Sequence, residues 1–522
     1  MLKKHSHRVR PTLLALALAS ALSLAACGGG GSSSSDNVTS VAPTPKTAKN
    51  VILMISDGAS YNAWEMAANW QQGAKANELD EYRNLNVRLG MTTFPLNTES
   101  APTNDNTAMV SYDAAKAWDP TVEATKESVK GKYETAIAAY KYLRLGVTDS
   151  AAAATALASG QKTYNNAINY NNFGQPIEYI TQIAKRQGKA TGVVTSVQLS
   201  HATPAGFGAQ NISRNNYAEI AQDMLGKGTL DLVMGTGNPE FDDNGKPVDP
   251  AAGKTPAQCD ADATCKAAHK YVGGAVYWDN LKKGSLKPGS SLTPWKLIQS
   301  KADFEALAQG KLDVKAPLVG IPPVAGTLQQ SRKLEVLGAD ASQPSGVKQI
   351  ETVPTLATMT KGALNYLGKE KKGMFLMIEG GAVDWASHAN QSDRIVEEQV
   401  DFNNALAAVQ DWVAKNSNWD ETLLIVTTDH GNSLPLGMDS DVKAFSPTVS
   451  KGQNKVPDAR YWTNNHTNEV VRLWARGQGA DKLKSMATKK DARFAEVVGH
   501  NNDGSYLDNT EIFTAMKAAY GL

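Results

Sequence analysis

The chain has 522 residues, with 53 Lys and Arg against 52 Asp and Glu, and 41% of its residues are hydrophobic. This composition is typical of a globular protein and argues against a disordered or membrane-embedded chain. The charge is nearly balanced and the body of the chain has no Lys/Arg run. We therefore expect no nucleic-acid-binding role, because that role requires a basic surface.

The first residues have the pattern of a targeting signal. Basic residues within positions 3–10 precede an apolar stretch at 12–26 that is too short to span a bilayer as a helix. The stretch ends in Leu-Ala-Ala-Cys, which resembles the lipobox of bacterial lipoproteins. We therefore expect residues 1–26 to be a lipoprotein signal peptide and Cys27 to be lipidated, so that the protein is exported and held on a membrane in the periplasm or at the cell surface. A plain secretory signal is the alternative.

Two further features, a flexible tether and a pair of cysteines, fit an exported chain. Residues 27–49 are rich in Gly, Ser and Pro and predict a flexible tether to a folded domain at 50–522. Cys259 and Cys265 lie six positions apart in a polar stretch. In an exported chain this pair predicts a local disulfide. A metal-binding pair is the alternative, although the spacing is unusual for zinc.

Short apolar runs alternate with amphipathic stretches along the domain. Such continuous runs are typical of strands buried on both faces of a mostly parallel sheet. Apolar side chains at three- to four-residue spacing over 395–413 predict a helix. The alternation predicts an α/β fold, with ligands beyond the carboxyl ends of the strands. The clearest strand-like runs are 51–55, 191–197, 232–234, 374–378, 423–428 and 470–474.

Two regions break this alternation. Residues 65–145 are polar and rich in Ala, Asn and Lys, and they predict an insertion that contains helices. Residues 238–350 are rich in Gly, Pro, Asp and Lys, and they predict a loop-rich excursion that contains the cysteine pair. Either region is expected to shape access to a site.

Three of the predicted strands run into side chains that commonly bind metals. One Asp-Gly after a strand is more often a turn, but three such polar endings, two of them with His, predict metal ligation. Nitrogen and carboxylate oxygen without thiolate suit a catalytic zinc rather than a closed structural site. Two of these side chains are four positions apart and would share one helix face. The candidate ligands are Asp57, then Glu379, Asp384 and His388, then Asp429 and His430, with His466 further along the chain.

A serine stands at the start of a predicted helix. The segment 147–155 reads Val-Thr-Asp-Ser-Ala-Ala-Ala-Ala-Thr, so Ser150 would lie in the first turn of a helix that stops at Gly160. Free N–H groups and the helix dipole favour an anion there. An ordinary N-cap is the alternative, because Asp and Ser are preferred at that position.

Together these motifs resemble those of the alkaline phosphatases in order, local spacing and residue type, over nearly the whole mature chain. The Thr-Asp-Ser-Ala motif would make Ser150 the nucleophile. Thr203, in His-Ala-Thr-Pro-Ala, would support a magnesium ion, and Arg214 would grip phosphate. The resemblance implies a three-layer α/β/α sandwich and hydrolysis of small-molecule phosphate monoesters through a phosphoserine, with release of orthophosphate. It also allows a homodimer.

The resemblance further implies two zinc ions and one magnesium ion per chain. Asp57 would bridge two of the ions. The implied ligands are Asp384, His388 and His466 for one zinc, Asp57, Asp429 and His430 for the second, and Asp57, Thr203 and Glu379 for magnesium, with Asp149 counted as a further metal-binding residue.

Two positions depart from the pattern of many bacterial members, which carry Asp in place of His201 and Lys in place of Trp385. The departures bear on magnesium affinity and on the grip on phosphate. His201 either contacts the third ion through water or caps a loop, and Trp385 either walls the pocket or packs.

Two other functions are weighed. A phosphodiesterase of the same superfamily usually has Thr as its nucleophile, so Ser150 together with Arg214 favours the monoesterase. A non-catalytic surface lipoprotein that binds phosphate or metal would be expected to have a broken ligand set, and here every position is filled.

Overall fold

The computed structural model describes residues 47–108, 111–121, 139–498 and 502–522. The predicted signal peptide, Cys27 and most of the predicted tether lie outside these residues. Among the helices described, none combines the length and the apolar character that crossing a membrane requires.

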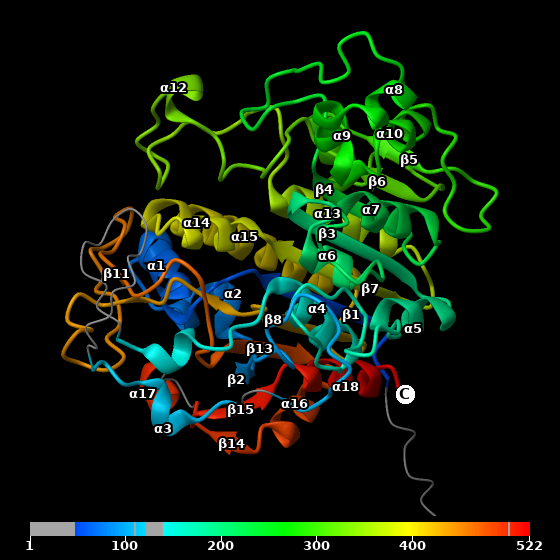
Figure 1. Ribbon diagram of the computed structural model, residues 1–522. Helices are drawn as coiled ribbons and strands as arrows, with labels where there is room; N and C mark the ends of the chain where they lie inside the picture. Colours follow the sequence, from blue (N-terminus) through cyan, green and yellow to red (C-terminus); the bar gives the residue numbers. More distant parts are fainter. Residues whose placement is uncertain (1–46, 109–110, 122–138, 499–501) are drawn as a thin grey trace, which may run out of the picture. The chain divides into compact units, whose positions relative to one another are not determined.

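A central sheet organises the described part of the chain. Its strands are β1 (Asn50–Ser56), β2 (Val87–Thr92), β3 (Ala190–Gln198), β4 (Leu232–Thr236), β5 (Lys296–Ile298), β6 (Leu318–Gly320), β7 (Met374–Gly380), β8 (Thr422–Thr427), β13 (Val471–Gly477), β14 (Lys489–Lys490) and β15 (Ser505–Asp508). Within the described residues they form an 11-stranded sheet in the order β14-β15-β2-β13-β8-β1-β7-β3-β4-β6-β5 (Figure 1). The strands from β8 to β5 run parallel, whereas β13 is antiparallel to both of its neighbours. The expected mostly parallel sheet is confirmed.

Helices cover both faces of this sheet. Successive side chains of β1 point to opposite faces, so Ile52 and Met54 pack into one core while Leu53 and Ile55 pack into the other. The first core is closed by α1 (Tyr61–Gln72), α2 (Asp80–Arg83), α11 (Lys301–Ala308), α13 (Leu356–Leu367), α14 (Ala382–His388) and α15 (Ser392–Asn416). The second is closed by α4 (Ser150–Ser159), α5 (Ile180–Arg186), α6 (Ala202–Gly206), α7 (Tyr217–Gly226), α10 (Ala275–Lys282), α16 (Ala480–Met486) and α18 (Thr510–Ala519). This is the expected three-layer sandwich.

The expected insertion at 65–145 is wrong in its first part. Most of α1 is buried, and Trp64 packs edge-on against Phe402 of α15 at 5.6 Å between ring centroids. Strand β2 lies inside the central sheet. The stretch can be polar and still lie in the core because its buried polar groups have partners. The carboxylate of Glu65, for example, pairs with the guanidinium of Arg472. A helix that buries an ion pair has a weaker hydrophobic pattern, so the sequence pattern alone does not identify it as a core helix.

The excursion at 238–350 contains short helices and loops, and it also supplies the edge strands β5 and β6 (Figure 1). The segment thus combines short helices and loops with strands that extend the sheet. The shorter elements of the described chain are η1 (Ala76–Glu78), α3 (Ala114–Ala117), η2 (Lys141–Arg144), α8 (Pro256–Ala261), α9 (Ala263–His269), η3 (Lys270–Val272), α12 (Leu334–Leu337), β9 (Gly431–Asn432), β10 (Pro435–Leu436), β11 (Arg460–Tyr461), β12 (His466–Thr467) and α17 (Ala492–Val498).

Candidate metal centre and nucleophile

Three neighbouring strands bring acidic side chains to one edge of the sheet. Strands β8, β1 and β7 are adjacent and parallel, so their carboxyl ends lie side by side. Asp57 follows β1, Glu379 lies near the end of β7, and Asp429 follows β8. The central part of the candidate site is therefore a consequence of strand order, as expected for an α/β sheet.

Asp384, His388 and His466 form the first group of ligand atoms. The Asp384 carboxylate lies 3.4 Å from Nε2 of each histidine, and the two Nε2 atoms are 3.1 Å apart. Nδ1 of His388 donates to the carbonyl of Asn464 at 2.8 Å, and Nδ1 of His466 donates to the carbonyl of Thr148 at 2.7 Å. Because Nδ1 holds the proton, each Nε2 keeps a lone pair for a cation.

Asp57, Asp429 and His430 form a second group beside the first. Nε2 of His430 lies 3.1 Å from Asp429 Oδ2 and 3.6 Å from Asp57 Oδ1. The rings of His430 and His466 stack with their centroids 3.6 Å apart, so the two groups adjoin. In each group the ligand atoms lie within 4.8 Å of one another, which is close enough for one ion to contact them all.

Asp57 also belongs to a third set, made of oxygen ligands. The hydroxyl of Thr203 donates to Asp57 Oδ2 at 3.3 Å. The Glu379 carboxylate interacts with both of these side chains, and its Oε2 also accepts the hydroxyl of Thr195. A set that contains only oxygen suits a hard cation such as magnesium.

Several carboxylate oxygens of these sets are buried without a hydrogen-bond donor. Among the described residues, Asp57 Oδ1, Glu379 Oε1 and Asp429 Oδ2 have none. Burial, with the carboxylates of Asp429 and Asp384 nearby, raises the pKa of Asp57, and burial raises the pKa of Glu379 to about 7. Buried carboxylates of this kind require a compensating positive charge. The residues present therefore fit metal cations.

Ser150 begins α4 next to the second group. Its Oγ lies 3.2 Å from Nε2 of His430, and the side chain is buried. Asp149 caps the helix by accepting the N–H of Ala152 at 2.9 Å, and the helix ends at Gly160 in a left-handed conformation. Both ends of the helix lie where the sequence predicts them. The serine and the positive end of the helix dipole thus occupy the same place.

Among the described residues, the Asp149 carboxylate belongs to none of the groups that could hold an ion, and its role as a metal ligand stays a prediction. Its Oδ1 caps α4, while its Oδ2 accepts the N–H of Asn166 at 3.0 Å and Nη1 of Arg214 at 3.1 Å. Burial opposes the charge of the guanidinium, but this carboxylate raises the pKa of Arg214. Its two oxygens are therefore engaged by the start of α4, by Asn166 and by Arg214.

His201 and Trp385 lie against each other, with ring centroids 5.6 Å apart. His201 precedes α6, but its side chain makes no capping hydrogen bond, and within the described chain its Nδ1 has no partner. Burial, followed by the charge of Arg214, lowers the pKa of His201 to about 3. The side chain is thus a neutral imidazole that does not cap the loop. Its contact with a third ion stays a prediction.

The residues that hold the ligands in place were missed from sequence. Asn432 donates Nδ2 to Asp384 Oδ1 at 2.7 Å, and Ser60 donates its hydroxyl to the carbonyl of Asn432 at 2.7 Å. Gly58 has φ +66°, and a Cβ there would lie 2.5 Å from Asp384 Oδ1. A glycine directly after a ligand was the only sequence signal for this close packing.

Known proteins with sequences similar to this chain include bacterial alkaline phosphatases. The alkaline phosphatase family model matches residues 48–255 and 327–512. An alkaline phosphatase of Escherichia fergusonii is 27% identical over 512 residues, which cover 91% of this chain and 87% of that relative. Alkaline phosphatase 3 of Bacillus subtilis is 31% identical over 320 residues, which cover 60% of this chain, and the match spans only 55% of that relative.

Among solved structures, Thermus thermophilus alkaline phosphatase matches with a TM-score of 0.56 and 19% identity, covering 91% of this chain and 92% of that one. The alkaline phosphatase of the Antarctic bacterium TAB5 matches with a TM-score of 0.53 and 20% identity, covering 91% and 99%. These likenesses show a shared fold. With the family model matching most of its length, the chain belongs to the alkaline phosphatase family. The unmatched segment between the two parts of the model lies inside the excursion at 238–350.

Proposed function

We propose that this protein is a metal-dependent phosphatase that hydrolyses phosphate monoesters and releases orthophosphate. One observation carries the proposal: Ser150 Oγ lies 3.2 Å from Nε2 of His430, at the start of a helix and inside a set of buried, uncompensated carboxylates. A serine hydroxyl in this position has both an activating environment and a place for a phosphate anion.

In this proposal Ser150 attacks the phosphorus atom, the ester oxygen leaves with the alcohol, and a phosphoserine remains. Arg214 offers a planar fork to two non-bridging oxygens, and Asp149 holds that fork in place through the contact at 3.1 Å. The free N–H groups at the start of α4 add positive potential. Water then attacks the phosphoserine, which releases orthophosphate and restores the hydroxyl.

The proposed cofactors are two zinc ions and one magnesium ion. Zinc would be held by the first group (Asp384, His388 and His466) and by the second (Asp57, Asp429 and His430), and magnesium by Asp57, Thr203 and Glu379. When bound, these cations would supply positive charge that stabilises the serine alkoxide and the oxygen of the leaving alcohol.

We also propose export and membrane anchoring through Cys27, which rests on the sequence motifs alone. Labelling with a radioactive fatty acid is expected to mark the wild type and not Cys27→Ala. Label on the variant would show that the lipobox interpretation is wrong.

The test of the function is Ser150→Ala in protein loaded with zinc and magnesium. We expect the wild type to hydrolyse p-nitrophenyl phosphate faster than bis-p-nitrophenyl phosphate, and the variant to lose about 1,000-fold or more in kcat. Acid quenching after a pulse of labelled phosphate ester should trap label on the wild type alone.

Ser159→Ala is the matched control, because Ser159 lies on the same helix and donates only to the backbone of Thr155. It should keep its activity. Unchanged turnover in Ser150→Ala would overturn the serine assignment. A wild type that prefers the diester would favour the phosphodiesterase, and metal or phosphate binding without turnover would favour the non-catalytic lipoprotein.

A further inference from the structure

Aromatic rings and a lysine border the proposed phosphate site, and the proposed reaction uses none of them. We call this set the rim. Its members are Tyr217, Lys270 and Tyr271, which are half-buried. Tyr217 lies against His201, which in turn contacts Trp385. Tyr217 begins α7, three residues after Arg214, whereas Lys270 and Tyr271 begin η3 in the excursion at 238–350.

The members of the rim contact one another closely. The ring of Tyr217 is nearly parallel to that of His201, at 15° and 6.2 Å between centroids, and meets Tyr271 at 4.7 Å. Nζ of Lys270 lies 5.0 Å from the Tyr217 ring and 4.7 Å from the Tyr271 ring. Within the part of the chain that is described, no carboxylate lies within ion-pair distance of Lys270. Its charge is therefore held by ring faces and stays available to an anion.

The rim lies close to the groups that would hold the phosphate. Burial raises the pKa of Tyr217, while the Arg214 guanidinium, which interacts with the Tyr217 hydroxyl, opposes that rise. Both Arg214 and Lys270 add to the effect of burial in lowering the pKa of His201. The two cations therefore act on one common space, with Arg214 nearer the nucleophile helix and Lys270 on the excursion.

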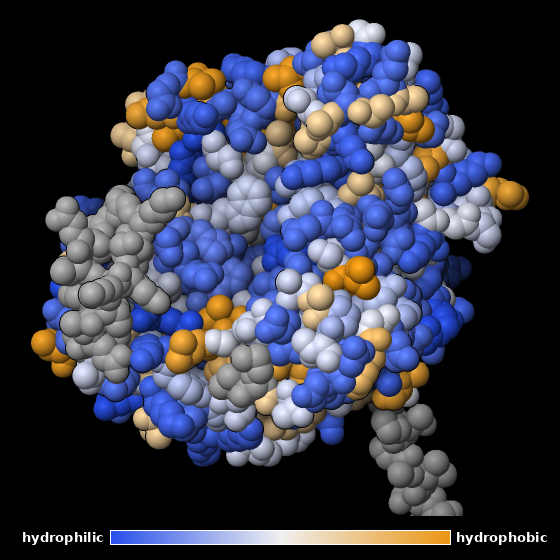
Figure 2. All heavy atoms as spheres, viewed as in Figure 1, coloured by the Kyte–Doolittle hydropathy of each residue, from blue (hydrophilic) through white to orange (hydrophobic). Residues whose placement is uncertain are grey.

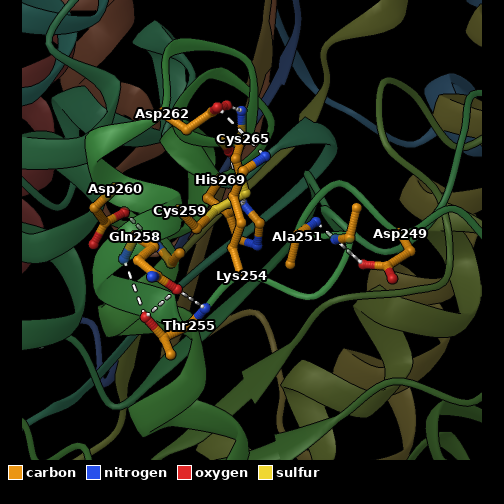
Figure 3. Close-up of a disulfide and its surroundings, with 12 residues drawn as sticks. Asp249, Ala251, Lys254, Thr255, Gln258, Cys259, Asp260, Asp262, Cys265 and His269 are labelled. Carbon is orange, nitrogen blue, oxygen red and sulfur yellow. Dashed lines mark hydrogen bonds and ion pairs between the residues drawn. A yellow bond between two sulfur atoms is a disulfide. The ribbon is translucent and has the colours of Figure 1, made fainter.

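A disulfide fixes the segment that carries Lys270 and Tyr271. The bond between Cys259 and Cys265 (Figure 3) ties α8 to α9. In the chain, η3 follows α9 directly. Nδ1 of His269 donates to the Cys265 carbonyl at 2.8 Å. His269 also lies near both sulfur atoms, but because these are bonded to each other they are not metal ligands. The disulfide thus serves to hold a loop at the site.

We propose that the rim is a leaving-group subsite for phosphate monoesters of planar aromatic groups that carry a second negative charge. The proposal rests on the proposed phosphatase function. The rings of Tyr217 and Tyr271 are inclined at 60° to each other. With the phosphate on Arg214, a planar leaving group would therefore stack on one of these rings and meet the other edge-on, and Lys270 would attract its anionic substituent. An alkyl leaving group would gain nothing from these side chains.

The test compares three substrates: ethyl phosphate, phenyl phosphate and 4-carboxyphenyl phosphate. The values of kcat/KM are measured for the metal-loaded wild type, for Lys270→Met and for Tyr271→Leu. Each variant is compared with the wild type on the same substrate, so that differences in leaving-group reactivity cancel. Lys283→Met is the matched control, because this substitution removes the same charge from an exposed position of the same excursion.

Lys270→Met is expected to lower kcat/KM about five- to tenfold for 4-carboxyphenyl phosphate only, with a smaller loss at high salt because a half-exposed charge is screened. Tyr271→Leu is expected to lower it about three- to tenfold for both aryl esters and to spare ethyl phosphate. Lys283→Met should change none of the three.

Equal losses on all three substrates, or no loss on any, would overturn the subsite. In either case, release of phosphate from ethyl phosphate by the wild type would leave the phosphatase function standing. A wild type that releases phosphate from none of the three esters would overturn both proposals.

Discussion

In the first metal-ligand group, one hydrogen bond orients each histidine and sets its tautomer. His388 and His466 each donate Nδ1 to a main-chain carbonyl, and this fixes the tautomer whose Nε2 is free. Asn432 in turn holds Asp384 from the other side. The N–H donors of the two histidines are thus used by main-chain carbonyls, and the lone pairs of their Nε2 atoms and of the Asp384 carboxylate face one another.

A buried carboxyl outside the site gives a prediction of pH dependence. Burial, with Glu397 and Asp401 nearby, raises the pKa of Glu398 from 4.5 to about 8. The folded protein therefore holds a proton that the unfolded chain releases between these pH values, so this group makes folding less favourable as pH rises through that window. Glu398→Gln cannot release a proton. Relative to the wild type, we expect the free energy of unfolding of this variant to rise by on the order of 2 kcal/mol as the pH increases from 4.5 to above 8.

Urea unfolding at a series of pH values measures this difference. Glu335→Gln, at an exposed position, is the control and should leave the wild-type pH dependence unchanged. Parallel pH profiles for Glu398→Gln and the wild type would show that the buried carboxyl does not hold a proton.

At the scale of elements, the nucleophile helix is fixed by close contact with α6. A Cβ added at Gly206 would lie 2.6 Å from the Cβ of Ala154 and 3.2 Å from its carbonyl carbon. Because part of this obstacle is backbone, Gly206→Ala must push α4 away. We expect a loss of about 1–3 kcal/mol in stability and a fall in kcat, since Ser150 moves with the helix.

Thermal unfolding and turnover of p-nitrophenyl phosphate together measure this effect. The control is Gly226→Ala in α7, where the new Cβ meets only the hydroxyl of Tyr277, at 3.1 Å. That side chain end can move, so the control should unfold and turn over like the wild type. If Gly206→Ala also behaved like the wild type, tight packing of α6 would not be what positions the serine.

At the scale of the whole molecule, metal binding and stability are expected to be coupled. Burying Asp57, Glu379 and Asp429 together is unfavourable without cations, so chelation should lower Tm and abolish activity, and added zinc and magnesium should restore both. A cation at about 1,000 times its dissociation constant adds about 4 kcal/mol per site. Calorimetry with and without chelator measures the change.

The control for this experiment is Asp384→Asn, which leaves the first group with one carboxylate fewer. Its Tm should respond less to added zinc than that of the wild type. An unchanged Tm of the wild type after complete metal removal, verified by metal analysis, would contradict the coupling.

The surface adds little to this picture. Figure 2 shows a largely hydrophilic face on which hydrophobic residues are scattered. Among the described residues, the two most exposed large apolar side chains, Leu292 and Val442, lie outside helices and strands. Apolar side chains that are exposed singly are common on protein surfaces, so these exposures need no separate explanation.

Local pattern determined much of this protein. Continuous apolar runs predicted β1, β3, β4, β7, β8 and β13, because strands buried on both faces must be apolar throughout. Cap residues predicted α4 from Ser150 to its stop at Gly160, and polar residues after strands indicated most of the side chains that the fold gathers as candidate metal ligands. Where polar groups are buried in pairs, as with Glu65 and Arg472, the same reading failed and took a core helix for an insertion.

Only the tertiary structure decided what each polar side chain faces. Asp149 has the residue type and position of a ligand, yet its two oxygens accept hydrogen bonds from the N–H groups of Ala152 and Asn166 and from Arg214. Tyr217 and Lys270 lie far apart in sequence, and the fold of the excursion brings them together. Periodicity records which side chains are buried, whereas direction and distance depend on how strands, caps and loops from distant parts of the chain pack.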